Sequence, residues 1–167
     1  TELLLSDSLN VSRENLILNF KQSVNAKIYN NFLLKLHRRK KREPIAYILR
    51  KKEFWKNNFY VNKDVLIPRP ETEFLVDETL KIISNYQKKR LLEIGIGSGC
   101  IITSILKDRK NCYATGIDCC KKALKIAKIN VKLHQIENRI KIFKSNVDNF
   151  NTGKYDLILS NPPYIDK

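Results

Sequence analysis

The sequence predicts an α/β protein: a parallel sheet with covering helices, preceded by a small helical lobe and a β-hairpin linker. Three observations predict it. Apolar residues recur at helical spacing over the first 42 residues, and aromatic and β-branched residues cluster between residues 54 and 67. From Arg90 onward short apolar strands alternate with helical patterns, which requires right-handed crossovers and a parallel sheet. We therefore divide the chain into residues 1–42, 43–68 and 69–167.

In the helical lobe, residues 1–42, the spacing of the apolar residues predicts two or three short helices. The last ends in the basic run "HRRKKR", which suits the negative end of a helix dipole. Pro44 then disfavours helix at the residue before it, so we expect the linker to begin there. Within the linker, Lys56-Asn57-Asn58 has the composition of a hairpin turn, with strands extending as far as Ile67.

The third region begins with a helix, because Pro70 suits a first helical position and Glu71 suits a first turn. Its buried face is expected to contain Phe74, Leu75, Leu80 and Ile83. The strands expected after it are Leu91–Ile94, Tyr113–Ile117, Ile140–Phe143 and Tyr155–Leu159. The helices expected between them are Cys100–Lys107 and Lys121–Leu133.

Composition narrows the function classes. The apolar fraction is 43%, enough for a buried core, and no apolar run reaches the roughly 18–20 residues of a membrane span. The four cysteines contain no C-x-x-C pair, so we expect reduced thiols in the cytoplasm and no metal site. The net charge of +15 fits either a solvated lysine-rich surface or a polyanionic partner, and charge alone does not separate them.

The stretch "LLEIGIGSGC" predicts a ligand-binding loop, because Gly95, Gly97 and Gly99 lie between a strand and a helix. Asp118 follows at the end of the next strand, where a carboxylate can accept both ribose hydroxyls of an adenosine ligand. The spacing G-x-G-x-G departs from the G-x-G-x-x-G of dinucleotide sites. Glu93 suits a cation, which favours S-adenosylmethionine with its sulfonium and ammonium groups.

The stretch "SNPPYI" predicts a site for a planar –NH2 group at the carboxyl end of the last strand. Pro162 and Pro163 carry no backbone N–H, so they form a stiff turn that displays carbonyl oxygens. The Asn161 side-chain oxygen and the Pro162 carbonyl can each accept one hydrogen, while Tyr164 can stack on the flat group. Held in this way, the nitrogen can direct its lone pair at a methyl group on sulfur.

Four segments together resemble the release-factor glutamine methyltransferases, the HemK/PrmC family. They are "REPIAYILRKKEFW", "VLIPRPETE", "EIGIGSGCI" and "SNPPYI". The resemblance implies a Rossmann-like class I S-adenosylmethionine-dependent methyltransferase domain. It also implies methylation of the glutamine in the Gly-Gly-Gln loop of peptide-chain release factors, by a cytoplasmic monomer with no direct nucleic-acid substrate and no membrane partner.

The resemblance also assigns residues. The cofactor would be bound by Glu93, Gly95, Ile96, Gly97, Ser98, Gly99, Asp118, Asn146, Val147 and Asn161. Asn161, Pro162 and Tyr164 would be catalytic, and the glutamine would be held by Asn161, Pro162, Pro163, Tyr164 and Arg69. The helical lobe would help to grip the release factor, and the "IPRPETE" stretch would line the site near the methyl donor.

Two departures from the family pattern stand out. Where the family has an acidic residue followed by an aromatic, this chain has Asn146-Val147, and Asp148 and Phe150 are an alternative pair for contacting the adenine. The family also continues with further strands after Asn-Pro-Pro-Tyr, so we expect a chain that is incomplete at both ends. Its last strand would then be an apolar edge and the chain poorly soluble.

Two other substrates remain open at this point. A ribosomal-protein glutamine methyltransferase would use the same Asn-Pro-Pro-Tyr turn. A nucleic-acid methyltransferase would use it on the amino group of a flipped adenine or cytosine, which the net charge would suit.

Overall fold

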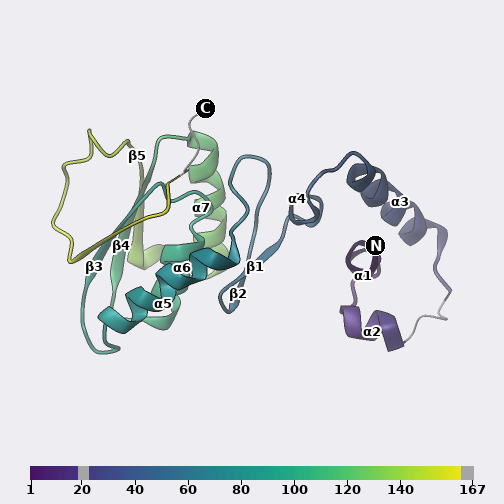
Figure 1. Ribbon diagram of the computed structural model, residues 1–167, viewed down its shortest axis with the longest axis horizontal. Coiled ribbons are helices and arrows are strands. Elements are labelled where there is room, and N and C mark those ends of the chain that lie inside the picture. The colour runs from purple at the N-terminus through teal and green to yellow at the C-terminus, as the bar shows by residue number, and fades with distance from the viewer. Residues whose placement is uncertain (19–22, 163–167) are drawn as a thin grey trace. The chain divides into compact units, whose positions relative to one another are not determined.

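The structure, a computed structural model, describes residues 1–18 and 23–162 (Figure 1). It forms two compact units, Thr1–Lys51 and Lys52–Lys167, which we describe separately. In these two described stretches, no helix is both long enough and apolar enough to cross a membrane.

The first unit is helical, as expected. Its described helices are α1 (Glu2–Leu9), α2 (Arg13–Leu18), α3 (Ala26–Lys40) and α4 (Ile45–Leu49). The side chain of Asn25 caps α3 by accepting a hydrogen bond from the Ile28 N–H at 2.9 Å. Leu4 of α1 and Ile48 of α4 are buried, and α1 contacts both α3 and α4.

Helix α4 corrects the expectation that the linker begins at residue 43. Pro44 is the residue before a further helix, in an extended conformation at φ −58° and ψ 137°. Arg38 holds this helix against α3, because its guanidinium donates to the Glu43 carboxylate at 2.8 Å and to the Tyr47 and Ile48 carbonyls. The first compact unit therefore extends to Lys51.

The second unit begins with a hairpin whose turn differs from the predicted one. Strands β1 (Lys52–Phe54) and β2 (Asn57–Phe59) pair antiparallel with Phe54 opposite Asn57, so Trp55 and Lys56 form the turn. Phe54 and Phe59 are both 1% exposed and lie on one face of the hairpin, with ring centroids 6.2 Å apart. Burial of both rings fixes this register and draws Asn57 and Asn58 into the strand. Val65 and Ile67, expected in strands, lie outside regular structure.

The sheet confirms the predicted α/β fold. Its strands are β3 (Arg90–Ile94), β4 (Tyr113–Asp118), β5 (Ile140–Lys144) and β6 (Leu157–Ser160), in the order β5-β4-β3-β6, with every pair parallel. The chain order of the strands reverses between β3 and β6. In open α/β sheets, ligands bind beyond the carboxyl ends of the strands at such a switch point.

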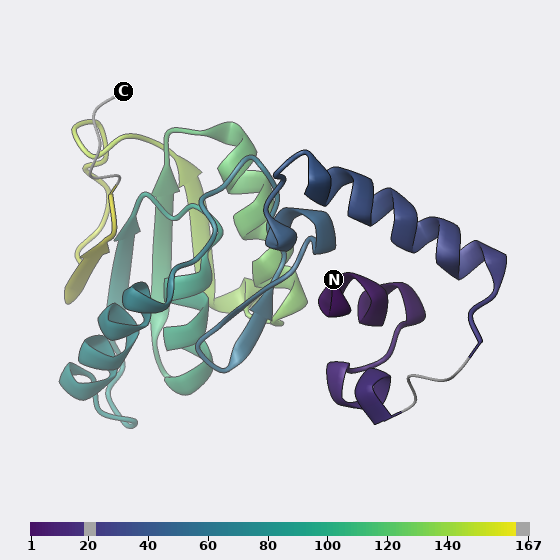
Figure 2. The same ribbon diagram turned by 45° about the vertical axis from the view of Figure 1, so that its right-hand side comes forward.

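Helices α5 (Glu73–Ile82), α6 (Cys100–Asp108) and α7 (Lys121–Leu133) lie on one face of the sheet (Figure 2). A short 3₁₀ turn, η1 (Pro70–Thr72), leads into α5, and another, η2 (Glu137–Arg139), leads into β5. The crossover from β5 to β6, residues 145–156, contains no helix. Helix α6 contacts both neighbouring helices and β4, and every residue from Cys100 to Leu106 is buried.

The predicted buried face of α5 is confirmed at Leu75, Leu80 and Ile83, which pack in or against the core, and is wrong at Phe74. Phe74 is 68% exposed, and the buried residues of this region are Val76, Thr79 and Ile83. Their spacing of three and four residues places them on one side of the helix, whereas Phe74 lies two residues from Val76 and so about 200° around the axis. The sequence suggested Phe74 because of its size.

The packing of α6 can be tested at Leu106, whose side chain is 0% exposed. We expect Leu106→Ala to lower the free energy of unfolding by about 2–5 kcal/mol, because the cavity adds to the lost apolar burial. The matched control is Leu133→Ala at a 57% exposed position of α7, expected to cost less than about 0.5 kcal/mol. Equal losses in urea denaturation would contradict the burial of α6.

Candidate functional site

The glycine loop connects β3 to α6 and is held by the end of β4. The N–H groups of Gly95 and Ile96 both donate to the Ile117 carbonyl, each at 2.9 Å. Gly95 and Gly97 have φ values of +71° and +53°, in the left-handed region that favours glycine. Around Gly95 there is no heavy atom within 4 Å of an added Cβ position, so a ligand can approach the backbone there.

Asp118 is the last residue of β4 and lies beside this loop, as the sequence predicted. Its Oδ2 accepts a hydrogen bond from the Gly97 N–H at 2.9 Å, and its Oδ1 accepts one from the Cys120 N–H at 2.8 Å. A carboxylate has about four lone-pair sites, so both oxygens can accept further bonds from a ligand. The carboxylate therefore fixes the loop and still offers acceptors beside it.

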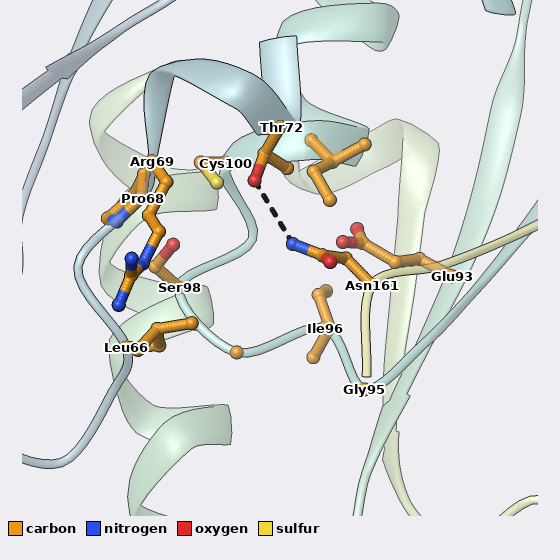
Figure 3. A pocket seen from close by; sticks show the side chains of 12 residues that line it. Leu66, Pro68, Arg69, Thr72, Glu93, Gly95, Ile96, Ser98, Cys100 and Asn161 are labelled. Carbon is orange, nitrogen blue, oxygen red and sulfur yellow. Dashed lines mark hydrogen bonds between the residues drawn. The ribbon is translucent and has the colours of Figure 1, made fainter. Parts of the chain in front are cut away.

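A small pocket brings the separate motifs together (Figure 3). It has a volume of about 60 Å³. Its lining comes from the carboxyl end of β3, the glycine loop, the start of α6, the segment between Leu66 and Thr72, and Asn161 after β6. The predicted site residues in this lining are Arg69, Glu93, Gly95, Ile96, Gly97, Ser98 and Asn161. Gly99 is buried and is not part of this lining.

Glu93 is an acid buried in the wall of this pocket. Its side chain is 1% exposed, and its Oε2 accepts a hydrogen bond from the Ile102 N–H at 3.2 Å. Burial raises the pKa of Glu93 to about 8, and the negative charge of Asp118 acts in the same direction. Burial thus favours the neutral form of this acid. Burial also raises the pKa of the neighbouring Cys100 thiol to about 12, so this thiol is neutral.

Asn161 enters the pocket from the opposite side of the switch point. Its Nδ2 donates a hydrogen bond to Thr72 Oγ1 at 3.1 Å, across 89 residues of sequence (Figure 3). Pro162 follows it and is exposed. Pro163 and Tyr164, expected to hold the substrate and, for Tyr164, to act in catalysis, lie outside the described residues.

The structure does not bring the predicted adenine contacts into the pocket. Asn146 and Val147 follow β5 and are exposed, and the Asn146 side chain accepts a hydrogen bond from a backbone N–H three residues on. Asp148 is also exposed. The ring of Phe150 packs 6.2 Å from that of Phe143, so the alternative aromatic belongs to a small cluster against β5. Neither pair lines the pocket.

Sequence reasoning missed Asn130, a fully buried residue of α7. Its Nδ2 donates to the Ser98 carbonyl at 2.8 Å and to the Tyr60 carbonyl at 2.9 Å. Its Oδ1 accepts from the Tyr60 N–H at 2.7 Å. This one side chain therefore ties the glycine loop to the segment that follows the hairpin. The signal in the sequence was an amide on the apolar face of a helix.

Comparison with known proteins gives two family matches. Residues 71–167 match the methyltransferase small domain, and residues 1–49 match the PrmC N-terminal domain. The chain is similar to release factor glutamine methyltransferases of Buchnera aphidicola (40% identity over 78% of this chain and 47% of the relative) and Coxiella burnetii (40% over 98% and 59%). It is also similar to a bifunctional methyltransferase of Rickettsia bellii (37% over 98% and 34%). The chain thus spans about a third to three fifths of the length of these relatives.

Solved structures share the fold at low sequence identity. A METTL16 methyltransferase domain matches with a TM-score of 0.53 and 21% identity, over 64% of this chain and 51% of that one. The human methyltransferase 10 domain containing protein matches with a TM-score of 0.53 and 20% identity, over 64% and 54%. These similarities concern the arrangement of the sheet and helices.

Gly116 tests the packing beneath the loop. A Cβ added to this β4 residue would lie 2.2 Å from the Cδ1 atom of Ile96. We expect Gly116→Ala to cost about 1–3 kcal/mol of unfolding free energy, because Ile96 and the loop must shift. In an Ile96→Val background, which lacks that atom, the same change should cost clearly less. The four proteins of this double-mutant cycle are compared by urea denaturation. If the two substitutions lower the free energy of unfolding additively, the contact is contradicted.

The raised pKa of Glu93 predicts that the free energy of unfolding depends on pH. Because its folded pKa of about 8 lies above the ordinary value of 4.5, the folded protein binds more protons than the unfolded chain between those pH values. The free energy of unfolding should therefore fall as pH rises through this window. Glu93→Gln should remove most of this slope, whereas Glu53→Gln at an exposed position should leave it unchanged. Parallel slopes for wild type and Glu93→Gln in urea titrations would refute the assignment.

Proposed function

This chain belongs to the HemK/PrmC family of methyltransferases, and on that premise we propose that it methylates the side-chain amide of a glutamine. The donor is S-adenosylmethionine, and the acceptor is the glutamine in the Gly-Gly-Gln loop of peptide-chain release factors. The observation that carries the proposal is that Asn161 and the glycine loop line one pocket at the switch point of the sheet. The names of the similar Buchnera and Coxiella proteins support the choice of substrate.

The residues around the glycine loop fit S-adenosylmethionine. Open space over the Gly95 backbone admits a ligand, and the carboxylate of Asp118 offers acceptors for ribose hydroxyls. When bound, the cofactor supplies an electrophilic methyl group on a positively charged sulfur. A cation favours the ionised form of a neighbouring acid, so it would lower the pKa of Glu93 from about 8. The buried acid thus gives this pocket a preference for a positively charged ligand.

Asn161 and Pro162 orient the acceptor in this proposal. The Asn161 side-chain oxygen and the Pro162 carbonyl accept the two hydrogens of the glutamine –NH2 group. An amide nitrogen is a poor nucleophile, so alignment has to provide much of the lowering of the barrier, out of the roughly 7–11 kcal/mol that proximity can supply. The chain needs no strong base before transfer, because the nitrogen can release its proton after it has been methylated.

The other proposed roles follow from position in the chain. Arg69 lines the pocket and is exposed, so it can contact the substrate loop at the entrance. Tyr164 would stack on the glutamine amide, and the helical first unit would bind the body of the release factor. Release factors act in translation, so we place the reaction in the cytoplasm, with the protein acting as a monomer.

A second candidate, a nucleic-acid amino-methyltransferase, is favoured by one observation. The outward face of α7 carries five exposed lysines, at positions 121, 122, 125, 128 and 132. Such a face could contact phosphates, and binding would then weaken steeply with salt. We rank it second because lysines on a surface helix are commonly solvated.

Asn161→Ala tests the proposed reaction. The full natural chain is incubated with S-adenosylmethionine and an unmethylated release factor. The mass of the Gly-Gly-Gln peptide is then measured by mass spectrometry. We expect wild type to add one methyl and Asn161→Ala to be slower by about 100-fold or more, because the acceptor for the substrate amide is lost. Cofactor binding should be partly retained, and the exposed control Asn111→Ala should match wild type. Methyl appearing on added nucleic acid or ribosomal protein would overturn the substrate.

A further inference from the structure

We propose that Thr72 is a positioning residue that determines which end of the Asn161 carboxamide is presented to the substrate. The inference rests on the proposed function, since it explains how Asn161 becomes an acceptor. The Asn161 Nδ2 donates to Thr72 Oγ1 at 3.1 Å, and both residues line the pocket (Figure 3). Thr72 belongs to the "IPRPETE" stretch that was expected to line the site, but the sequence assigned it no individual role.

The argument begins with the chemistry of the carboxamide. An asparagine side chain has a donor end, the –NH2 group, and an acceptor end, the oxygen, and a half-turn about its last bond exchanges them. The –NH2 group of a glutamine substrate can bond only to the acceptor end. In the structure the Thr72 hydroxyl oxygen accepts from the donor end of Asn161. The oxygen is then turned away from Thr72.

The position of the Thr72 hydroxyl is fixed by its surroundings. Thr72 ends the 3₁₀ turn that begins at Pro70, and its N–H donates to the Arg69 carbonyl at 3.0 Å. Proline fixes φ at the start of this turn, and a β-branched side chain is stiff at χ1. The acceptor is therefore in place before the substrate arrives.

The contact is partly buried, and Leu66, Pro68 and Ile96 line the same pocket. Loss of the acceptor at position 72 removes one hydrogen bond to the Asn161 –NH2 group. A side chain without an acceptor at position 72 should thus disturb the orientation of Asn161 more than it disturbs the fold.

Thr72→Val tests this assignment, because valine keeps the shape and lacks the acceptor. In the full natural chain we expect kcat for release-factor methylation to fall about 10-fold, as for the loss of one hydrogen bond. The KM for the release factor and the Kd of S-adenosylmethionine should stay within about twofold, because binding to the loop is untouched. Thr72→Ser, which keeps the hydroxyl, should restore kcat to within about twofold of wild type.

The matched control is Thr79→Val in α5, which removes a buried hydroxyl that donates to the Leu75 carbonyl at 2.7 Å, away from the pocket. Its kcat should equal that of wild type. A kcat of Thr72→Val equal to wild type would overturn the assignment. Equally low activity in Thr72→Ser and Thr72→Val would also overturn it, because packing rather than the hydroxyl would then be responsible.

A second measurement separates this inference from the proposed function. Hydrogen exchange at the Asn161 –NH2 group, followed by NMR, needs no substrate. Exchange should be faster in Thr72→Val than in wild type or Thr72→Ser, and equal rates would refute the contact. If wild type fails to methylate release factors while this difference is present, the proposed substrate is wrong and the orienting contact remains supported.

Discussion

The parallel pairing of β3 with both β4 and β6 is the constraint on which the site depends. Ile94 at the end of β3 lies opposite Ile117 on one side and Ser160 on the other. The residues that come next in this register are Gly95, Asp118 and Asn161, so they lie near one another at the carboxyl edge of the sheet. A slip of one residue in either pair would reverse which side chains face the core and would separate these groups. The site is thus a consequence of sheet register.

Hydrogen bonds to the backbone then hold the loop in one shape. Ile117 accepts two loop N–H groups, and Asp118 accepts a third from Gly97. On the far side, Asn130 fixes the Ser98 carbonyl through a side chain that is completely buried. These contacts order the cofactor loop before any ligand arrives, so less ordering entropy is lost on binding. Glu93, whose pKa is raised by burial, is a group in this wall whose charge can respond to the ligand.

Much of the fold could be predicted from the sequence because its local signals agree with one another. The four strands and helix α7 follow from periodicity, and the glycine loop follows from its place between a strand and a helix. The structure differs from the prediction where contacts between residues distant in the sequence determine the local conformation. Burial of two phenylalanine rings moved the hairpin turn, and the Arg38 contacts to Glu43 and α4 extended the first unit. The contact between Thr72 and Asn161 was missed for the same reason, because the two residues lie 89 positions apart.

The central claim is that the cofactor loop and Asn161 serve one pocket. It is tested most directly by hydrogen–deuterium exchange on the full natural chain, with and without S-adenosylhomocysteine. We expect the backbone amides of residues 95–99 and of Asn161 to be slowed together, because one ligand lies between them. Slower exchange confined to the loop, or found elsewhere with Asn161 unchanged, would contradict the claim.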